Sequence, residues 1–410
     1  ALCAGAAAQM PQMSMTDHAR TDHAGSDHAG SGTSLEPSST PVPMLMTTRD
    51  GWTLMAHGAG FLADQQQSGA RGADKLYSPN WAMFMAERRW GPGELTLRSM
   101  FSLEPATITD QRYPELFQTG ETAFGRPIVD GQHPHNFFME LAALYDVSLG
   151  EEGGLEIYAA PIGDPALGPE AFPHRESAAF DPLAPLGHHR QDSTHIAASV
   201  VTVGAKYGPA RIEFSGFHGR EPGENRWVFL TGAIDSWSTR FSLSPTPDWT
   251  GQVSWGKLHS PEALNPLEDQ IRMTASVNYN RKLAGGNWAS LLLWGRTRDA
   301  AGGNVFNSYL LESNLGLGRN HVWTRIENVD KSTELELEQA AEPPGFVERF
   351  LARIQAYSLG YARDLPSPDW LPTSLGAQWT LYQAPDFLHG IYANHPQGIA
   401  VFLRVRLGRY

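Results

Sequence analysis

Methionine, histidine and aspartate are concentrated in one short segment near the start of the chain. Three methionines come first, and three near-copies of a five-residue unit follow, with the sequences TDHAR, TDHAG and SDHAG. Thioether sulphur prefers Cu(I), whereas imidazole suits Cu(II), zinc and nickel. The segment therefore predicts a metal-binding sequence whose ligands are Met10, Met13, Met15, His18, His23 and His28. The alternative is a solvated linker with a chance repeat.

A second set of soft ligands follows this segment. Within the alternating segments of residues 52–101, one parity is apolar and the other carries methionine and histidine. The predicted inward-facing set is Met55, His57, Met83, Met85 and Met100, and Met44 and Met46 of the tail are predicted to pass metal on to it. A thioether ladder for a soft metal is one explanation. Packing against an inward-folded loop or tail is the other, because methionine commonly fills irregular gaps.

Histidines gather in two long connections, in the motifs QHPH and HHRQDSTH and in the segment upstream of the second motif. Two imidazoles separated by one residue, with an aspartate and further histidines on a neighbouring loop, suit a tetrahedral or tetragonal metal site. The predicted ligands are His133, His135, His174, His188, His189, Asp192 and His195. No standard zinc-enzyme spacing such as H-E-x-x-H occurs. The alternative is a hydrogen-bonded network that folds the loops together.

The elements that must position these residues are strands. Residues 269–281 show the clearest alternation, with Ile271, Met273 and Val277 on one parity and polar residues on the other. The same pattern predicts sixteen strands, near residues 52–62, 78–89, 94–103, 136–149, 154–162, 194–207, 210–219, 234–244, 249–259, 269–282, 287–298, 306–317, 320–330, 348–363, 373–384 and 398–410.

The connections between these strands alternate in length. Every second one is a short turn such as Gly91-Pro92-Gly93, while the others are mostly longer, above all 104–135 and 163–193. Short turns at one rim and long loops at the other are typical of transmembrane barrels. We therefore expect an all-β fold, an antiparallel transmembrane β-barrel of about 16 strands. A soluble sandwich or propeller is the alternative, but no propeller-like repeat occurs.

Composition excludes several other classes of protein. The chain has 410 residues but no run of about 18 apolar residues, so no transmembrane helix is expected. A single cysteine, Cys3, excludes a disulfide framework and a Cys-based zinc or iron–sulfur site. The net charge of −13 argues against a nucleic-acid partner.

Three regions are expected along the chain. Residues 1–8 are interpreted as the remnant of a signal peptide, because Ala6-Ala7-Ala8 resembles a small-residue cleavage site. Residues 9–50 are predicted to be a disordered Met/His-rich tail, since they contain too few apolar residues to offset the entropy of ordering. Residues 51–410 form the predicted barrel, with long outer loops 104–135 and 163–193. An even strand number places the tail in the periplasm.

The tail resembles the metal-binding leaders of bacterial copper-resistance outer-membrane proteins, which also join such a leader to a carboxy-terminal barrel. The resemblance covers about the first 50 residues by composition and the barrel only by class. It implies a protein in the outer membrane of a Gram-negative bacterium that binds copper, or a similar soft metal, and mediates its transport or sequestration. The expected partners are the lipid bilayer, metal ions or small solutes, and a periplasmic metal chaperone.

Two other functions remain open. One is a general diffusion porin whose loop residues set selectivity. The other is a hydrolase built from Asp192, Ser193 and His195, which is disfavoured because adjacent residues of an extended strand point to opposite faces. No enzymatic activity, catalytic residue or organic cofactor is therefore expected, and a copper ion is the one bound group predicted.

Overall fold

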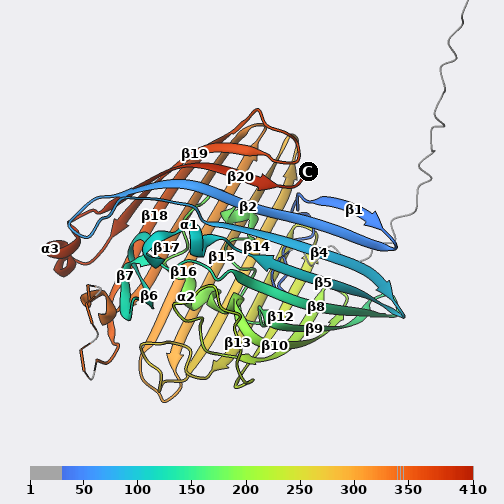
Figure 1. Cartoon of the computed structure of the whole chain (residues 1–410), viewed down its shortest axis with the longest axis horizontal. Helices are drawn as coiled ribbons and strands as arrows, with labels where there is room; N and C mark the ends of the chain where they lie inside the picture. The colour runs from blue at the N-terminus through green and yellow to red at the C-terminus, as the bar shows by residue number, and fades with distance from the viewer. Residues whose placement is uncertain (1–29, 339, 342, 345, 410) are drawn as a thin grey trace, which may run out of the picture.

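Sixteen long antiparallel strands close into one barrel in the computed structural model, which describes residues 30–338, 340–341, 343–344 and 346–409 (Figure 1). Among these residues, no helix is both long and apolar enough to cross a membrane. All sixteen predicted strands are confirmed. They are β2 (Trp52–Gln67), β4 (Asn80–Trp90), β5 (Gly93–Phe101), β8 (Phe138–Leu149), β9 (Gly153–Gly163), β10 (Ala197–Tyr207), β11 (Ala210–His218), β12 (Ser236–Thr246), β13 (Trp249–Leu258), β14 (Gln270–Leu283), β15 (Gly286–Asp299), β16 (Val305–Leu317), β17 (Asn320–Ser332), β18 (Phe350–Leu365), β19 (Thr373–Gln383) and β20 (Gln397–Leu407).

The barrel closes through β2, which pairs with β4 along residues 53–60 and with β20 along residues 58–67. Two short strands, β1 (Leu45–Arg49) and β3 (Lys75–Tyr77), also pair with β2 and extend the wall beside it. A bridge between Met44 and Arg409 brings the start of β1 next to the end of β20. Met44 and β1 are therefore held at the barrel seam.

Burial alternates along the strands in the sense opposite to that of a soluble protein. In β14 the side chains of Arg272, Thr274 and Asn278 are buried, while Met273 and Val277 are 37% and 46% exposed. Apolar side chains gain nothing from facing water, so this outer surface is suited to lipid. In a closed barrel, every strand also finds hydrogen-bond partners on both sides, as a bilayer requires. The predicted alternation is thus confirmed with its polar parity inside.

The two ends of the barrel differ as predicted. Short turns join β4 to β5, β10 to β11 and β16 to β17, and the opposite end carries the long connections 102–137 and 164–196. We call these the turn end and the loop end. These two connections contain a separate hairpin and short helices: β6 (Tyr113–Ala123), β7 (Arg126–Gln132), α1 (Glu104–Thr107), η2 (Thr109–Gln111), η3 (Glu176–Ala178), α2 (His188–Gln191) and η4 (Ser193–His195). Further short helices lie between β17 and β18, namely η5 (Thr333–Glu336), and between β19 and β20, namely η6 (Asp386–Leu388) and α3 (His389–Tyr392).

The loops fill the lumen and are fixed there by buried ion pairs. Arg175, from the connection 164–196, contacts Asp192 at 2.6 Å and Glu312 of β16 at 3.0 Å. Arg325 of β17 also lies 3.0 Å from Glu312. All four groups are buried. Since a buried charge is tolerated only when it is paired, this network ties the loop firmly to the inner wall.

Residues 30–44 enter the lumen as well, which corrects the predicted boundary of the tail at residue 50. Ser31 Oγ donates to Asp164, the backbone of Gly32 donates to Glu140, and Thr33 Oγ1 donates to Glu213. These luminal carboxylates supply acceptors that a composition-based prediction of disorder could not include. Residues 1–8 and 9–29, with the predicted ligands Met10, Met13, Met15, His18, His23 and His28, lie outside the described residues.

Candidate functional site

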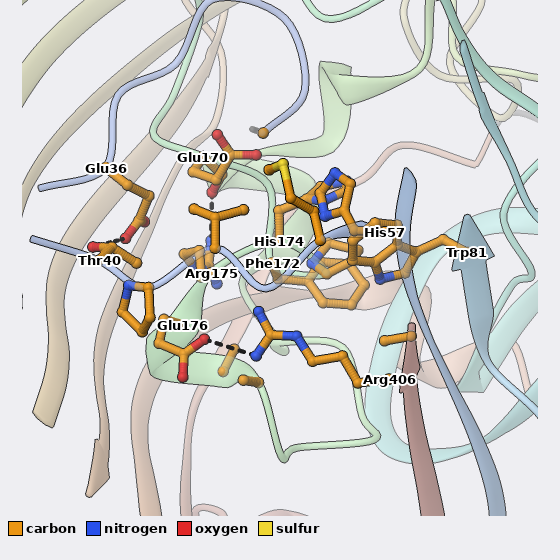
Figure 2. Close-up of a pocket in the computed structure, with 18 of the residues that line it drawn as sticks. Glu36, Thr40, His57, Trp81, Glu170, Phe172, His174, Arg175, Glu176 and Arg406 are labelled. Carbon is orange, nitrogen blue, oxygen red and sulfur yellow. Dashed lines mark hydrogen bonds and ion pairs between the residues drawn. The ribbon is translucent and has the colours of Figure 1, made fainter. Parts of the chain in front are cut away.

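A cavity of about 600 Å³ lies in the lumen between the N-terminal segment, the wall and the connection 164–196. Figure 2 shows its two contrasting sides. Its charged side carries Glu36, Glu170 and Glu176, and its aromatic side carries His57 and His174 with Trp81 and Phe172. The thioethers of Met44, Met46, Met55 and Met85 also line the cavity.

The predicted methionines of the long wall strands, Met55, Met83, Met85 and Met100, face the interior, whereas Met46 of β1 is 62% exposed. Strand pairing places Met46, Met55 and Met85 directly opposite one another, and His57, Met83 and Met100 form a second row. Directly opposed residues of antiparallel strands share a face. The side chains therefore form one buried cluster, which we call the methionine cluster: Met83, Met85, Met100 and Met139, with Met44 and Met55 packed against it.

Simple alternation along residues 136–149 puts one member of this cluster, Met139, on the same parity as the apolar residues Leu141 and Tyr145, which is the outer face. A register irregularity between Met100 and Phe101, where β5 pairs with β8, reverses the phase of the neighbouring residues. As a result Met139 and Glu140 are both fully buried. A bulge of this kind leaves no clear signal in a single sequence.

Histidine meets sulphur at the edge of the methionine cluster. His57 Nε2 lies 3.2 Å from Met83 Sδ, and the His57 ring contacts the edge of Trp81. Trp81 in turn packs on His174 with ring centroids 4.2 Å apart. Among the described residues, neither ring nitrogen of His174 has a hydrogen-bond partner. Free lone pairs and thioethers thus border the same cavity.

The other predicted histidines form a second cluster on the loops, which we call the histidine cluster. Its five members are His133, His135, His188, His189 and His195, with neighbouring ring centroids 5.1 to 6.4 Å apart. Three of them, His135, His188 and His195, also contact Phe172. They come from the segment after β7 and from α2 and η4. The two motifs singled out in the sequence therefore meet in space, as both the metal site and the alternative hydrogen-bonded network of the loops require.

Acceptors fix the orientation of most of these rings. His135 Nδ1 lies 3.0 Å from the Glu104 carboxylate, His188 Nδ1 lies 2.6 Å from Asp192 Oδ1, and His195 Nδ1 lies 2.6 Å from the Asp192 carbonyl oxygen. Such contacts select the tautomer that carries its proton on Nδ1. The predicted ligand Asp192 has its carboxylate engaged by His188 and Arg175, so it orients a ligand instead of facing the cavity.

Burial also keeps these loop imidazoles neutral. It is the main cause that lowers the pKa of each of His133, His174, His188, His189 and His195. A neutral ring retains the lone pair that a metal ion requires. For Asp192, burial alone would raise the pKa, but Arg175 and His188 together lower it below its usual range.

Glu121 joins the histidine cluster although the sequence did not single it out. Its Oε1 lies 2.9 Å from His133 Nε2, and its Oε2 contacts the guanidinium of Arg226. One ligand atom each from Glu121, His133 and His189 lies within 4.8 Å of the other two. The sequence offered no signal beyond an acidic residue in the same long connection as His133.

The residues of the proposed hydrolase do not form a catalytic arrangement. Ser193 Oγ contacts Arg272 and the His189 carbonyl oxygen, while His195 Nδ1 contacts the Asp192 backbone. A nucleophilic serine needs a base within hydrogen-bond reach. None of the described contacts joins Ser193 to His195, so the geometry gives the enzyme hypothesis no support.

The comparisons with known proteins identify the fold. No family model matches the chain, and no curated protein matches it. Among solved structures, OmpF of Salmonella typhi in complex with daunomycin has a TM-score of 0.51 at 9% identity, over 88% of this chain and 100% of that chain. An anion-selective porin from Comamonas acidovorans has a TM-score of 0.49 at 11% identity, over 87% of this chain and 100% of that chain. OprB of Pseudomonas putida has a TM-score of 0.49 at 10% identity, over 87% of this chain and 94% of that chain. The similarity to OmpF shows the fold of this chain alone, a closed antiparallel barrel of sixteen strands.

Proposed function

We propose that the protein is an outer-membrane barrel of a Gram-negative bacterium that binds copper, or a similar soft metal ion, in its lumen and mediates the transport or sequestration of that ion. The observation that carries the proposal is the pair of rows formed by Met46, Met55 and Met85 and by His57, Met83 and Met100 beside the 600 Å³ cavity. Thioether and imidazole together are the ligands of Cu(I).

Packing alone is the competing explanation for these methionines. Methionine does fill irregular gaps in apolar cores. Here, however, the side chains line the inner wall of a barrel whose other inward residues are mostly polar, and His57 sits among them with Nε2 3.2 Å from a sulphur atom. His174, on the same aromatic side of the cavity as His57, adds two unpartnered ring nitrogens. A metal ion gives both the thioethers and the imidazoles a role.

The filled lumen supports binding over free diffusion. The segment 30–44 and the connection 164–196 occupy the interior, and their anchors to Glu140, Glu213 and Glu312 are buried. An ion that crosses such an interior must exchange between ligands, and several weak sites in series favour this kind of passage. We propose that the tail delivers metal from the periplasmic side, where a metal chaperone is the expected donor.

The test is Cu(I) binding by the purified full-length protein in detergent, measured by competition with a coloured Cu(I) chelator. Changing both Met83→Leu and Met100→Leu should weaken binding in the barrel at least tenfold, since leucine keeps the volume and removes the sulphur. Met273→Leu is the matched control, because that side chain lies on the outer face. Equal Cu(I) affinity in the double variant and the control would contradict the proposal.

A general diffusion porin is the second candidate, and the similarity of the fold to OmpF favours it. Single-channel recording in planar bilayers separates the two functions. An open porin would conduct salt without regard to added copper. The proposed function predicts a low conductance that rises when residues 30–42 are deleted, because the N-terminal segment occupies the lumen.

A further inference from the structure

The geometry points to a second metal centre, separate from the methionine cluster, in which Glu121, His133 and His189 bind a divalent ion such as Zn²⁺, Cu²⁺ or Ni²⁺. The inference does not depend on the proposed passage of copper. It rests on the orientation of the ring nitrogens, the contact between Glu121 and His133, and a small cavity on which the ligands converge.

The ring nitrogens are the first observation. His133, His135, His188 and His195 all place Nδ1 next to an oxygen acceptor, and this contact selects the tautomer whose lone pair is on Nε2. Among the described residues, Nε2 of His133, His135 and His195 has no hydrogen-bond partner. Buried polar atoms are nearly always satisfied. Imidazoles held at Nδ1 by a carboxylate or carbonyl, with Nε2 left open, are the usual arrangement around a bound metal.

The contact between Glu121 and His133 is the second observation. Oε1 and Nε2 are 2.9 Å apart, yet they are not aligned as a hydrogen bond. His133 Nδ1 lies 3.0 Å from the Pro134 carbonyl oxygen, which can only accept, so Nδ1 holds the proton of the neutral ring. A carboxylate oxygen and an unprotonated ring nitrogen then lie 2.9 Å apart with no proton between them. A cation between them removes this repulsion.

The space available is the third observation. A cavity of about 10 Å³ is lined by Glu121 and by all five members of the histidine cluster. This volume corresponds to about one water-sized ligand. The three ligand atoms lie within 4.8 Å of one another, so small side-chain rotations bring them to the roughly 2.0–2.2 Å metal distances of imidazole and carboxylate ligands. His135 and His195 supply further nitrogens at the same cavity.

The ligand types select the metal. Imidazole and carboxylate favour borderline divalent ions, whereas the methionine cluster favours soft monovalent ones. Arg226 contacts the other oxygen of Glu121 and already neutralises part of its charge in the absence of metal. The centre therefore binds a divalent cation without leaving Glu121 uncompensated when it is empty.

Cobalt titration of the full-length chain tests this centre, because Co²⁺ ligated by nitrogen and oxygen absorbs visible light. His18, His23 and His28 are first changed to alanine so that the tail contributes no imidazole. We expect one Co²⁺ per chain, displaced by Zn²⁺. Changing His133→Asn and His189→Asn together should weaken binding at least 100-fold, and Glu121→Gln alone at least tenfold.

His259→Asn is the matched control, since that loop histidine lies outside the cluster and pairs with Asp269. Its Co²⁺ affinity should stay within twofold, and circular dichroism should show that each variant keeps its strand content. Absence of Co²⁺ binding in the parent, or equal binding by the His133/His189 variant, would overturn the inference. The proposed copper function would survive that result if Cu(I) binding still depended on Met83 and Met100.

Discussion

The methionine cluster and the histidine cluster differ in what holds them. The first is carried by wall strands, where hydrogen-bonded pairing puts Met55 opposite Met85 and His57 opposite Met83. The second is carried by loops, where buried polar contacts such as His135 to Glu104 fix each ring. A strand positions a side chain through its backbone register, whereas a loop needs a separate partner for each side chain.

This difference separates the two chemistries as well. The wall presents soft sulphur with one imidazole, and the loops present imidazole and carboxylate. The central 600 Å³ cavity touches both, because Met55 and Met85 line it together with His135 and His174. The barrel thus places two sites of unequal softness next to one another in a filled lumen.

The largest expected effect comes from removing the charge that holds the loops. Arg175→Met leaves the buried carboxylates of Asp192 and Glu312 without one of their cations, which should cost about 3–5 kcal/mol of stability. Arg281→Met is the control, since both side chains of its pair with Asp248 reach solvent, with Arg281 60% exposed, and such a pair is worth about 0–1 kcal/mol. Urea unfolding in lipid vesicles measures both.

The Arg175→Met variant also tests whether the methionine cluster and the histidine cluster bind metal independently of each other. Asp192 orients His188, so loss of Arg175 should weaken Co²⁺ binding by the loops more than Cu(I) binding by the wall. A parallel loss of both affinities would mean that the clusters form one cooperative site.

Ag⁺ is a soft ion with a single stable charge, so its binding tests whether the methionine cluster and the histidine cluster prefer different metals. Ag⁺ should bind the methionine cluster, and the combined change of Met83→Leu and Met100→Leu should weaken it at least tenfold by calorimetry. The same change should leave Zn²⁺ affinity within twofold. Weaker Zn²⁺ binding in this variant would show that sulphur contributes to the loop centre.

The sequence predicted the wall far better than the interior. Strict alternation predicted all sixteen strands and the inward direction of Met55, Met83, Met85 and Met100. It could do so because every residue that faces lipid must be apolar, so the residues between them face inward. It failed at Met139, where the irregularity beside Phe101 shifts the phase. Alternation predicts a face only while the register is regular.

The loop site was predictable in residue type but not in arrangement. Clustered histidines indicated that His133, His188 and His195 would act together, and they do meet. Glu121 and Glu104 could not be chosen, since both owe their place to the folding of the connection 102–137 against the connection 164–196. The N-terminal segment was misjudged for the same reason, as its partners Asp164 and Glu140 lie far away in sequence.

A smaller effect is expected from the residue that orients His135. Glu104→Gln keeps one acceptor oxygen but removes the negative charge beside Nδ1, which makes the ring a weaker ligand. If His135 completes the loop centre, Co²⁺ affinity should fall about tenfold and the visible bands should shift. Unchanged bands with weaker binding would instead indicate a merely structural role for Glu104.

The smallest expected effect is at Arg226, and its sign is informative. Burial lowers the pKa of this guanidinium to about 9, so it remains charged at pH 7 and competes with a metal ion for Glu121. Arg226→Gln should therefore tighten Zn²⁺ binding several-fold by calorimetry, because Glu121 can then use both oxygens. Weaker binding would show that Arg226 mainly holds Glu121 in place, and the loop centre would then depend on a fixed partner at every ligand, in contrast to the strand-borne methionines.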